Sequence, residues 1–250
     1  MPLETLVNAR DLGGYATQDG KVTKYGRFIR SELPKSLSEK DMKFLADYGV
    51  TLTLDFRTDN EVETLPSCLS ESKLKLKYIQ NSVFDKNDKN LSVHNNKPSA
   101  EQFDPEWSSV YIHMADNGKA WVKRNMELVA DWDGGVLYHC MTGKDRTGIF
   151  TAMLLGLCNA YPADIIADYS ISQVNLRPFY LEMMCFPEML GENGEPDLSK
   201  GFYQTRPETM YRFLEHINSK YGNMTDYLKS CGLSEETLSK IVQSLTEDVC

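Results

Sequence analysis

The spacing of apolar residues divides the first fifty residues into short strands followed by one helix. Residues 8–33 hold brief apolar stretches separated by glycines, a pattern that predicts short strands joined by turns. In residues 38–48 apolar side chains recur near helical spacing, with Ser38 placed as the N-cap and Gly49 placed to end the helix. We therefore expect this part of the chain to pass from strands into a helix.

A strand with a polar end is predicted at residues 50–55. Its sequence, VTLTLD, alternates apolar residues with threonines, which suits a strand with one face packed more tightly than the other. Thr58 and Glu61 have the spacing of a capping box, so a helix should begin directly after the strand. This arrangement places Asp55 and Arg57 at the carboxyl end of a strand, which is where α/β sheets bind ligands.

The middle of the chain predicts two more strands and two more helices. Residues 74–79 are expected to form a strand, and residues 119–130 an amphipathic helix closed by the glycine pair 134–135. The strand VLYH follows at 136–139. The almost wholly apolar stretch 147–157, TGIFTAMLLGL, is then expected to form a buried helix.

In the last third of the chain, proline and serine mark the starts of helices. Pro162 and Pro207 each stand where the first turn of a helix accepts proline, and Ser234 precedes two glutamates that suit a helix N-terminus. Residues 82–105 have the polar composition of a long loop, and residues 175–205 are expected to form a flap beside a site. The alternation of strand and helix indicates an α/β protein whose sheet is covered by helices.

Composition and charge limit the kinds of partner. The net charge of −9 and pI near 5.0 disfavour nucleic-acid binding, because such binding needs cations that neutralise phosphates. The six cysteines include no C-x-x-C pair, so we expect no metal site and no redox dithiol. The amino terminus has no signal-peptide pattern, and no apolar run approaches the ~18 residues of a membrane span. We expect a cytoplasmic protein without stable membrane insertion, with a non-classical route of export left open.

The stretch YHCMTGKDRTGIF, residues 138–150, concentrates charge between two apolar runs. Cys140 and Arg146 stand six residues apart, a spacing that gains weight from the strand before it and the buried helix after it. A loop with Gly143 and Gly148 that turns from a strand into a helix N-terminus points its N–H groups at an anion. Arg146 can add a planar fork for two phosphate oxygens. The same positive field favours the thiolate of Cys140, which is a nucleophile toward phosphorus.

Other residues of this stretch can complete the hydrolysis of a phosphate ester. After attack by the cysteine, the leaving oxygen needs a proton, which Asp145 inside the loop or Asp55 outside it can donate. Thr147 can donate its hydroxyl to the sulfur when the thiolate leaves in the second step. Lys144 adds charge for a multiply phosphorylated substrate.

Each of these residues also has a structural interpretation. Cys140 could be a buried thiol, and Asp145 could cap the helix or pair with a neighbouring cation. Asp55 and Arg57 could form an ion pair that supports the strand end. For His139, we favour orienting the loop through a hydrogen bond over acting as a base. A Walker A loop is excluded, because aspartate follows the lysine where serine or threonine would be needed.

The segment HCMTGKDRTG resembles the signature loop HCxxGKDRTG of the bacterial cysteine-dependent tyrosine phosphatases, which also act on phosphoserine and phosphoinositides. NARDLGGYATQDGKVTKYGRFIRSELP resembles that family's amino-terminal N-x-RDLGG segment with its following G-x-x-x-RS. LTLDFRTDNEVE resembles its DLR-[ST]-x-x-E stretch, and YGNMTDYLKSCGLSEETLSKI resembles its carboxy-terminal ending. The similarity covers most of the chain.

The resemblance implies a tyrosine-phosphatase-like fold of the α/β class, with a central mostly parallel sheet flanked by helices on both faces. Residues 1–250 would form a single domain with variable insertions near 80–118 and 175–205. The implied reaction is hydrolysis through a phosphocysteine, with no metal and no cofactor. The implied substrate is a phosphorylated protein, a phosphoinositide or a small phosphate ester, and the product is inorganic phosphate.

Carried over by position, the resemblance makes Cys140 the nucleophile, Arg146 the phosphate clamp and Asp145 the general acid. Lys144 is linked to broader substrate choice. Where the family usually has phenylalanine and alanine after the cysteine, this chain differs, which leaves substrate preference less defined than mechanism. The residues expected to contact the substrate are Met141, Thr142, Gly143, Lys144, Gly148, Asp55 and Arg57.

Two other functions stay open at this point. A phosphate-binding module would recognise phosphorylated partners without turnover. A rhodanese-like sulfur transferase would also use a loop cysteine, but the Asp-Arg-Thr ending of the loop has no obvious purpose there.

Overall fold

The computed structural model describes residues 1–72, 74–83, 107–183, 190–192 and 194–249. Its central sheet has the strand order β1-β3-β6-β4-β5. These strands are β1 (Arg10–Asp11), β3 (Phe28–Ser31), β6 (Gly135–His139), β4 (Val50–Asp55) and β5 (Lys77–Gln80). Strands β3, β6, β4 and β5 run parallel to one another, and β1 is antiparallel to β3. A separate antiparallel pair joins β2 (Lys21–Thr23) to β7 (Thr246–Asp248). The prediction of a mostly parallel sheet is confirmed.

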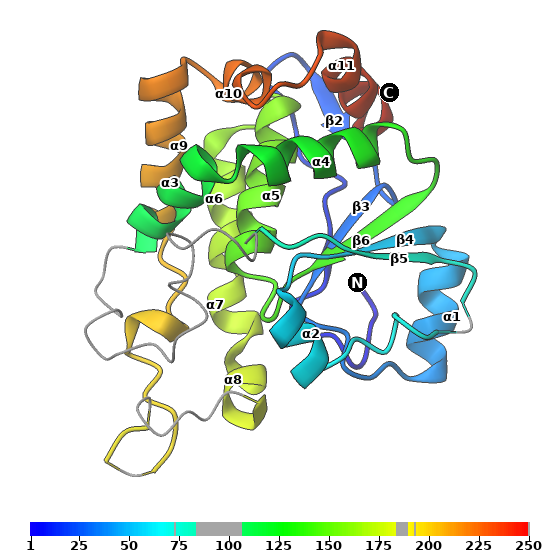
Figure 1. The fold of residues 1–250 in the computed structure, drawn as a ribbon, viewed down its shortest axis with the longest axis vertical. Coiled ribbons are helices and arrows are strands. Elements are labelled where there is room, and N and C mark those ends of the chain that lie inside the picture. The colour runs from blue at the N-terminus through cyan, green and yellow to red at the C-terminus, as the bar shows by residue number, and fades with distance from the viewer. Residues whose placement is uncertain (73, 84–106, 184–189, 193, 250) are drawn as a thin grey trace.

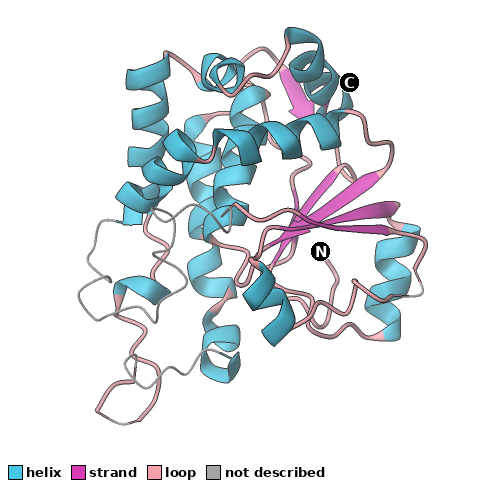
Figure 2. Ribbon diagram, in the orientation of Figure 1, coloured by secondary structure: helices cyan, strands magenta, loops and turns pink. Residues whose placement is uncertain are grey.

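Helices cover both faces of the central sheet (Figures 1 and 2). Neighbouring residues of β6 point to opposite faces, so Leu137 packs with Leu45 of the first helix, whereas Tyr138 packs edge to face with Phe150 on the other face. The predicted flanking of the sheet by helices is therefore confirmed. The helices are α1 (Glu39–Asp47), α2 (Asp59–Thr64), α3 (Trp107–Asn117), α4 (Lys119–Ala130), α5 (Asp145–Leu157), α6 (Pro162–Ser170), α7 (Ser172–Asn175), α8 (Arg177–Met183), α9 (Pro207–Tyr221), α10 (Met224–Ser230) and α11 (Glu235–Leu245), with a 3₁₀ turn at η4 (Gly201–Tyr203).

An irregularity in β4 lets this strand serve both faces. Val50 packs in the cluster around α1, whereas Leu52 and Leu54 belong to the larger core on the opposite face. Residues two apart in a regular strand share a face, and the pairing of β4 with β6 shifts register between Val50 and Leu52. The extra residue in between reverses the alternation, which the sequence pattern alone did not indicate.

The parallel pairing aligns three polar residues at one edge of the sheet. His139 at the end of β6 lies in register with Ser31 of β3 and with Asp55 of β4. The pairing continues beyond the strands, because Phe56 N–H donates to the His139 carbonyl at 2.9 Å and Leu33 N–H donates to the Met141 carbonyl at 2.9 Å. The loop that follows β6 therefore begins at the shared carboxyl edge of the sheet.

Helix α5 is the central helix of the larger core. Its sequence is apolar on all sides, and its residues from Thr147 to Leu155 are all buried. A helix without a polar face must be surrounded by other elements, and α5 contacts α6, α10, α11, β3 and β6. The prediction of a buried helix is confirmed. Nowhere in the described part of the chain is a helix both long and apolar enough to cross a membrane.

The predicted helix caps are confirmed. The Ser38 hydroxyl accepts the Asp41 N–H at 3.1 Å, and Gly49 follows α1 with a φ of +84°. The capping box is complete, since Glu61 N–H donates to the Thr58 hydroxyl and Thr58 N–H donates to the Glu61 carboxylate. Ser234 caps α11, and the two prolines stand in the first turns of α6 and α9.

One predicted strand boundary and one predicted helix stop are wrong. The strand expected at 74–79 begins at Lys77, because Leu74 and Leu76 pack from a turn in which Leu76 N–H donates to the Leu74 carbonyl. The helix expected at 119–130 has those bounds, but its C-cap is Asp131, so the glycine pair does not close it. The first glycine of the pair has a φ of +105° and the second opens β6, so these glycines start the strand instead of closing the helix.

The two stretches expected to be variable insertions, 80–118 and 175–205, hold elements that were not predicted. Helix α3 lies within 80–118, and its buried residues Ser108, Tyr111, Met114 and Ala115 recur at helical spacing. Most of the loop expected at 82–105 lies outside the described residues. Within 175–205, helix α8 and turn η4 contribute to a small hydrophobic core of Leu176, Tyr180 and Tyr203.

Candidate active site

The cysteine of the charged stretch lies in the loop between β6 and α5. Cys140 directly follows the end of β6, and only 1% of it is exposed. Residues 141–144 turn the chain, and Asp145 is the first residue of α5. The loop therefore joins the carboxyl edge of a parallel sheet to a helix N-terminus, as predicted, which is the geometry that binds anions.

The outer side of the loop is held by the amino-terminal segment and β3. Asn8 Nδ2 donates to the carbonyls of Thr142 (3.1 Å) and Gly143 (3.4 Å), and Arg30 Nη2 donates to Gly143 O (2.7 Å). A carbonyl and the next N–H of a trans peptide point in opposite directions. The N–H groups of Gly143 and Lys144 therefore point away from Asn8 and Arg30, toward the other side of the loop.

Glycine is required at position 143 for two independent reasons. Its φ is +67°, in the left-handed region that other residues avoid. A Cβ at this position would also lie 2.2 Å from the carbonyl oxygen of Ser31. The close approach of the loop to β3 is thus possible only without a side chain. Gly148 lies inside α5, where its N–H donates to the Lys144 carbonyl at 2.9 Å and a Cβ would meet Tyr169 at 3.2 Å.

Behind the loop, Asp168 of α6 anchors the two arginines that reach it. Arg10 Nε donates to Asp168 Oδ1 at 2.7 Å, and Arg30 Nη1 donates to Oδ2. Burial alone would raise the pKa of Asp168, but the charges of Arg30 and Arg10 outweigh it and lower that pKa. Asp168 thus stays ionised and fixes Arg30, whose other nitrogen holds the Gly143 carbonyl.

Arg146 is held by a carboxylate from α2. Its Nη1 and Nη2 each lie 2.7 Å from an oxygen of Glu61, and Nη1 also donates to the Phe56 carbonyl at 3.3 Å. These contacts use three of the five N–H groups of the guanidinium. The Nε–H and the second Nη2–H lie on one edge of the plane, and in the described part of the chain that edge is left for a ligand. A bidentate phosphate contact of the predicted kind fits that edge.

The Glu61–Arg146 pair is strongly ionised. Burial raises the pKa of Glu61, but the charge and hydrogen bonds of Arg146 outweigh burial and bring that pKa down to about 2. Burial lowers the pKa of Arg146, and the charge of Glu61 more than reverses this, so that its pKa rises. The arginine is therefore fixed in position and fully charged.

Asp55 and Arg57 form a fully buried ion pair. Asp55 Oδ2 accepts Arg57 Nη2 at 2.6 Å and the Tyr78 hydroxyl at 2.5 Å, and Oδ1 accepts Arg57 N–H at 2.9 Å. Both side chains have no exposed area. Burial raises the pKa of Asp55, but His139 and Arg57 outweigh burial and lower that pKa, so the group stays ionised. The structural interpretation fits this pair better than contact with a substrate.

His139 lies where a loop-orienting residue should lie. Its Nδ1 is 3.0 Å from the Cys140 carbonyl, and its Nε2 is 3.7 Å from Asp55 Oδ2. The ring is fully buried, and burial lowers its pKa despite the nearby Asp55 charge. A neutral ring that donates from Nδ1 to this carbonyl would fix the start of the loop.

Asp145 does not cap α5, but it forms a long ion pair with its neighbour Lys144. Position Lys144 is the N-cap of α5 and makes no side-chain capping bond. Asp145 Oδ1 accepts the Tyr111 hydroxyl at 2.5 Å, and Lys144 Nζ lies 3.8 Å away. About a quarter of the Asp145 side chain is exposed. Unlike Asp55, it is a carboxylate of the loop that a substrate can reach.

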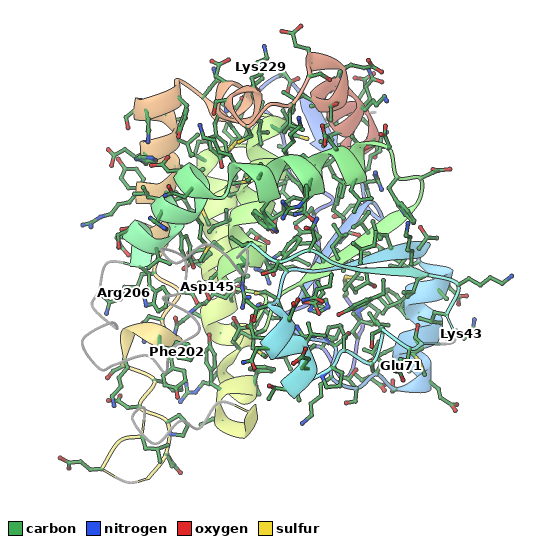
Figure 3. The ribbon with its side chains drawn as sticks, viewed as in Figure 1. Lys43, Glu71, Asp145, Phe202, Arg206 and Lys229 are labelled. Atoms are coloured by element: carbon green, nitrogen blue, oxygen red, sulfur yellow. The ribbon has the colours of Figure 1, made fainter. Side chains whose placement is uncertain are left out.

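Lys144 connects the loop to the segment at η4. Its Nζ donates to the Phe202 carbonyl at 2.6 Å and to the Gln204 carbonyl at 3.3 Å. The ammonium also lies 5.7 Å from the Trp107 ring centroid and 5.5 Å from that of Phe202. Burial lowers the pKa of Lys144. Phe202 lies below Asp145 in Figure 3, so this part of the predicted flap does border the loop.

The remaining predicted residues line the loop itself. The Thr147 hydroxyl is buried and has no hydrogen-bond partner among the described residues, including the Cys140 sulfur. Thr142 is buried, and Met141 is partly exposed. Over the described ranges, no three His, Cys, Asp or Glu side chains are grouped so that they could hold a metal ion.

Sequence reasoning missed two residues that contact the catalytic candidates. Glu61 was interpreted only as part of a capping box, although the same carboxylate also binds Arg146. Tyr111 lies in the expected insertion 80–118, where no motif pointed to it. The spacing Thr58-x-x-Glu61 carried a signal, whereas a lone tyrosine on an unpredicted helix carried none.

Comparison with known proteins agrees with this geometry. The family model described as the tyrosine phosphatase family matches residues 1–247. A tyrosine-protein phosphatase of Nostoc commune is 28% identical over 225 residues, covering 86% of this chain and 72% of the relative. A protein of Cupriavidus necator, assigned provisionally by its name to the tyrosine-protein phosphatases, is 25% identical over 92% of this chain and 82% of its own. The triple specificity protein phosphatase PtpB of Mycobacterium tuberculosis is 30% identical over 115 residues, 42% of each chain. The loop of Cys140, the paired Arg146 and this match over nearly the whole length show that the chain belongs to the tyrosine phosphatase family.

Proposed function

We propose that this hydrolase removes phosphate from phosphorylated proteins through a phosphocysteine intermediate, with Cys140 as the nucleophile. The observation that carries the proposal is the Cys140 loop, which joins β6 to α5 with Arg146 held beside it by Glu61. Membership of the tyrosine phosphatase family supports the same reaction.

In the proposed first step, the phosphate enters the inner side of the loop. The N–H groups opposite the Asn8 and Arg30 contacts and the Nε edge of Arg146 bind its oxygens. The Cys140 sulfur attacks phosphorus and forms the S–P bond while the P–O bond to the leaving group breaks. Asp145 gives its proton to the leaving oxygen.

In the proposed second step, water cleaves the phosphocysteine. Asp145, now a carboxylate, takes a proton from the water as its oxygen attacks phosphorus and the S–P bond breaks. The products are inorganic phosphate and the Cys140 thiolate. The Thr147 hydroxyl, which has no other described partner, can rotate to donate to that sulfur.

We propose a phosphotyrosine side chain as the principal substrate, with phosphoserine and phosphothreonine also accepted. The partly exposed Phe202 ring lies 5.5 Å from the Lys144 ammonium, which suits an aryl group beside the loop. A relative carries the name triple specificity protein phosphatase, which supports a broader choice. Phosphoinositides are a further candidate, because Lys144 could exchange its backbone carbonyl partners for a second phosphate.

Residues 1–250 would act as one catalytic domain, since the N-terminal segment, α2 and α6 all hold the loop.

Replacing Cys140 with serine tests the mechanism. We expect Cys140→Ser to abolish aryl phosphate hydrolysis and phosphocysteine formation while the fold is retained. Cys231→Ser is the matched control, because Cys231 is also a buried thiol but lies after α10. Retained turnover in Cys140→Ser would refute the nucleophile. Tight binding of phosphopeptides by the wild type without any release of phosphate would instead favour the phosphate-binding module.

A substrate panel tests the specificity. Phosphotyrosine, phosphoserine and phosphothreonine peptides, inositol lipids and sugar phosphates should be compared by kcat/KM. The proposal expects the phosphotyrosine peptides to rank first. A higher kcat/KM for an inositol lipid than for every peptide would replace phosphoprotein by phosphoinositide as the principal substrate.

A further inference from the structure

The carboxylate of Asp145 is bound on one oxygen by a tyrosine from another helix. Tyr111 of α3 donates its hydroxyl to Asp145 Oδ1 at 2.5 Å, across 34 residues of sequence. We propose that Tyr111 is a positioning residue for the acid–base step, whose hydroxyl fixes Oδ1 of Asp145 so that Oδ2 carries the proton to and from the substrate. The proposal rests on the proposed function, because it assumes that Asp145 is the general acid.

The surroundings of Tyr111 make this hydrogen bond directional. The Tyr111 side chain has no exposed area, so water does not compete for its hydroxyl. A second hydroxyl, that of Tyr169 on α6, lies 2.8 Å from the Tyr111 oxygen, and the two rings pack edge to face with centroids 5.8 Å apart. When Tyr111 donates to Asp145, Tyr169 can donate to Tyr111. The three groups then form one chain of hydrogen bonds, in which each bond strengthens the next.

The two oxygens of Asp145 are in different environments. Oδ1 is near both the Tyr111 hydroxyl and the Lys144 ammonium, at 2.5 and 3.8 Å. For Oδ2, no described residue provides a hydrogen-bond donor, and the side chain is about a quarter exposed. Tyr111 can donate to Oδ1 whether or not a proton sits on Oδ2. The hydroxyl therefore fixes the orientation of the carboxyl group in both halves of the reaction.

Several other charged or titratable groups act on Asp145. Arg146 and Lys144 belong to the same turn, Tyr169 comes from α6, and Tyr180 from α8. Neither Tyr169 nor Tyr180 makes a described hydrogen bond to the carboxylate. Tyr111 thus provides the direct contact that a single substitution can remove while these other influences stay in place.

The direction of the effect follows from the hydrogen bond. The Tyr111 hydroxyl fixes the carboxyl group of Asp145, and replacement by phenylalanine leaves that group free to rotate. The rate should therefore fall, and it should fall most with a substrate whose leaving group needs a proton.

The test compares variants by leaving group. The substrates are phenyl phosphate, whose leaving group needs a proton, and 4-nitrophenyl phosphate, whose leaving group needs it much less. For Tyr111→Phe we expect kcat/KM with phenyl phosphate to fall about tenfold, a modest part of a general-acid effect. The loss with 4-nitrophenyl phosphate should be less than about threefold. A merely structural loss would be the same with both substrates.

Tyr227→Phe is the matched control. Tyr227 is also fully buried, and its hydroxyl donates to the Ala115 carbonyl at 3.0 Å, away from the loop. Its removal should leave the leaving-group dependence unchanged. A second variant, with 3-fluorotyrosine at position 111, keeps the ring and the hydroxyl donor. It should keep the leaving-group dependence of the wild type, unlike phenylalanine.

Equal losses with both substrates in Tyr111→Phe, or the phenylalanine pattern in the 3-fluorotyrosine variant, would overturn the proposal. Asp145→Asn distinguishes this failure from a failure of the proposed function. If Asp145→Asn loses much more activity with phenyl phosphate than with 4-nitrophenyl phosphate while Tyr111 variants behave like wild type, only the positioning role is wrong. If Asp145→Asn itself behaves like wild type, Asp145 is not the acid and both proposals fall.

Discussion

The pair of Glu61 and Arg146 allows the support of the site to be tested separately from its chemistry. In Glu61→Gln, the amide oxygen can still accept the Thr58 N–H that the carboxylate accepts at 2.8 Å, so the cap of α2 is kept. The charge opposite Arg146 is lost. The Arg146 side chain, of which 13% is exposed, is then left without its counter-charge. A loss of stability in this variant therefore reports the ion pair and not the cap.

The magnitude follows from the pKa of Glu61. The difference between the ordinary value of 4.5 and about 2 corresponds to about 3 kcal/mol in the free energy of unfolding at neutral pH. A quarter of the Glu61 side chain is exposed, and solvent there weakens the attraction, so we expect Glu61→Gln to lose about 2 kcal/mol. Because Arg146 is also freed to rotate, KM for an aryl phosphate should rise about tenfold.

The effect has a defined pH dependence. The folded-state pKa of Glu61 is depressed, so its contribution is fully present above the unfolded pKa, near 4.5, and is lost as the pH falls toward 2. Urea unfolding of the wild type and Glu61→Gln at a series of pH values measures this directly. The difference between them should shrink to less than half of its neutral value by about pH 3.

A neighbouring glutamate supplies the control. Glu63 lies on the same helix and is exposed, so Glu63→Gln should change neither stability nor KM appreciably. An equal free energy of unfolding for Glu61→Gln and wild type at pH 7 would refute the reasoning, because the pair would then contribute nothing. A difference that stayed constant down to pH 3 would show that the loss arises from something other than the charge.

Two further substitutions test the structural assignments in the site. Gly143→Ala should destabilise the protein by about 2 kcal/mol or more and abolish activity, because a methyl group would lie 2.2 Å from Ser31 O. Gly20→Ala, at a φ of +82° with nothing within 4 Å, isolates the backbone cost, and an equal loss in both variants by thermal unfolding would contradict the steric argument. Asp55→Asn should cost about 3 kcal/mol, because it leaves Arg57 buried and unpaired, whereas Asp145→Asn should lose activity with little change in stability. A large fall in kcat/KM for Asp55→Asn with little loss of stability would restore Asp55 as a candidate acid.

The sequence predicted the elements whose signals are local. The capping box at Thr58 and the cap at Ser38 are formed by side chains that bond to backbone three residues away, so spacing alone reveals them. The buried helix α5 is apolar on every side, and a stretch of that length and composition is typical of a buried helix. The loop of Cys140 was predicted for the same reason, since strand, turn and helix follow each other directly in the chain.

What the sequence did not predict depends on contacts between distant segments. Leu74 and Leu76 are apolar because they pack on the α1 side of the sheet from a turn, and a period-two pattern cannot distinguish such a turn from a strand. The choice between Asp55 and Asp145 as acid depended on burial. Asp55 is buried by two partners. Arg57 follows its own strand, and Tyr78 comes from β5.

Asp145 and Arg146, the first two residues of α5, are each bound on one side by a residue from another helix. Glu61 of α2 takes one end of the Arg146 guanidinium, which leaves the Nε edge for phosphate. Tyr111 of α3 takes one oxygen of Asp145, which leaves the other for the proton. Asp145 and Arg146 are adjacent in sequence and opposite in charge, so without these partners they could bind each other or rotate freely. In the proposed mechanism the loop therefore supplies the reactive groups, and helices α2 and α3 determine which side of each group faces the substrate.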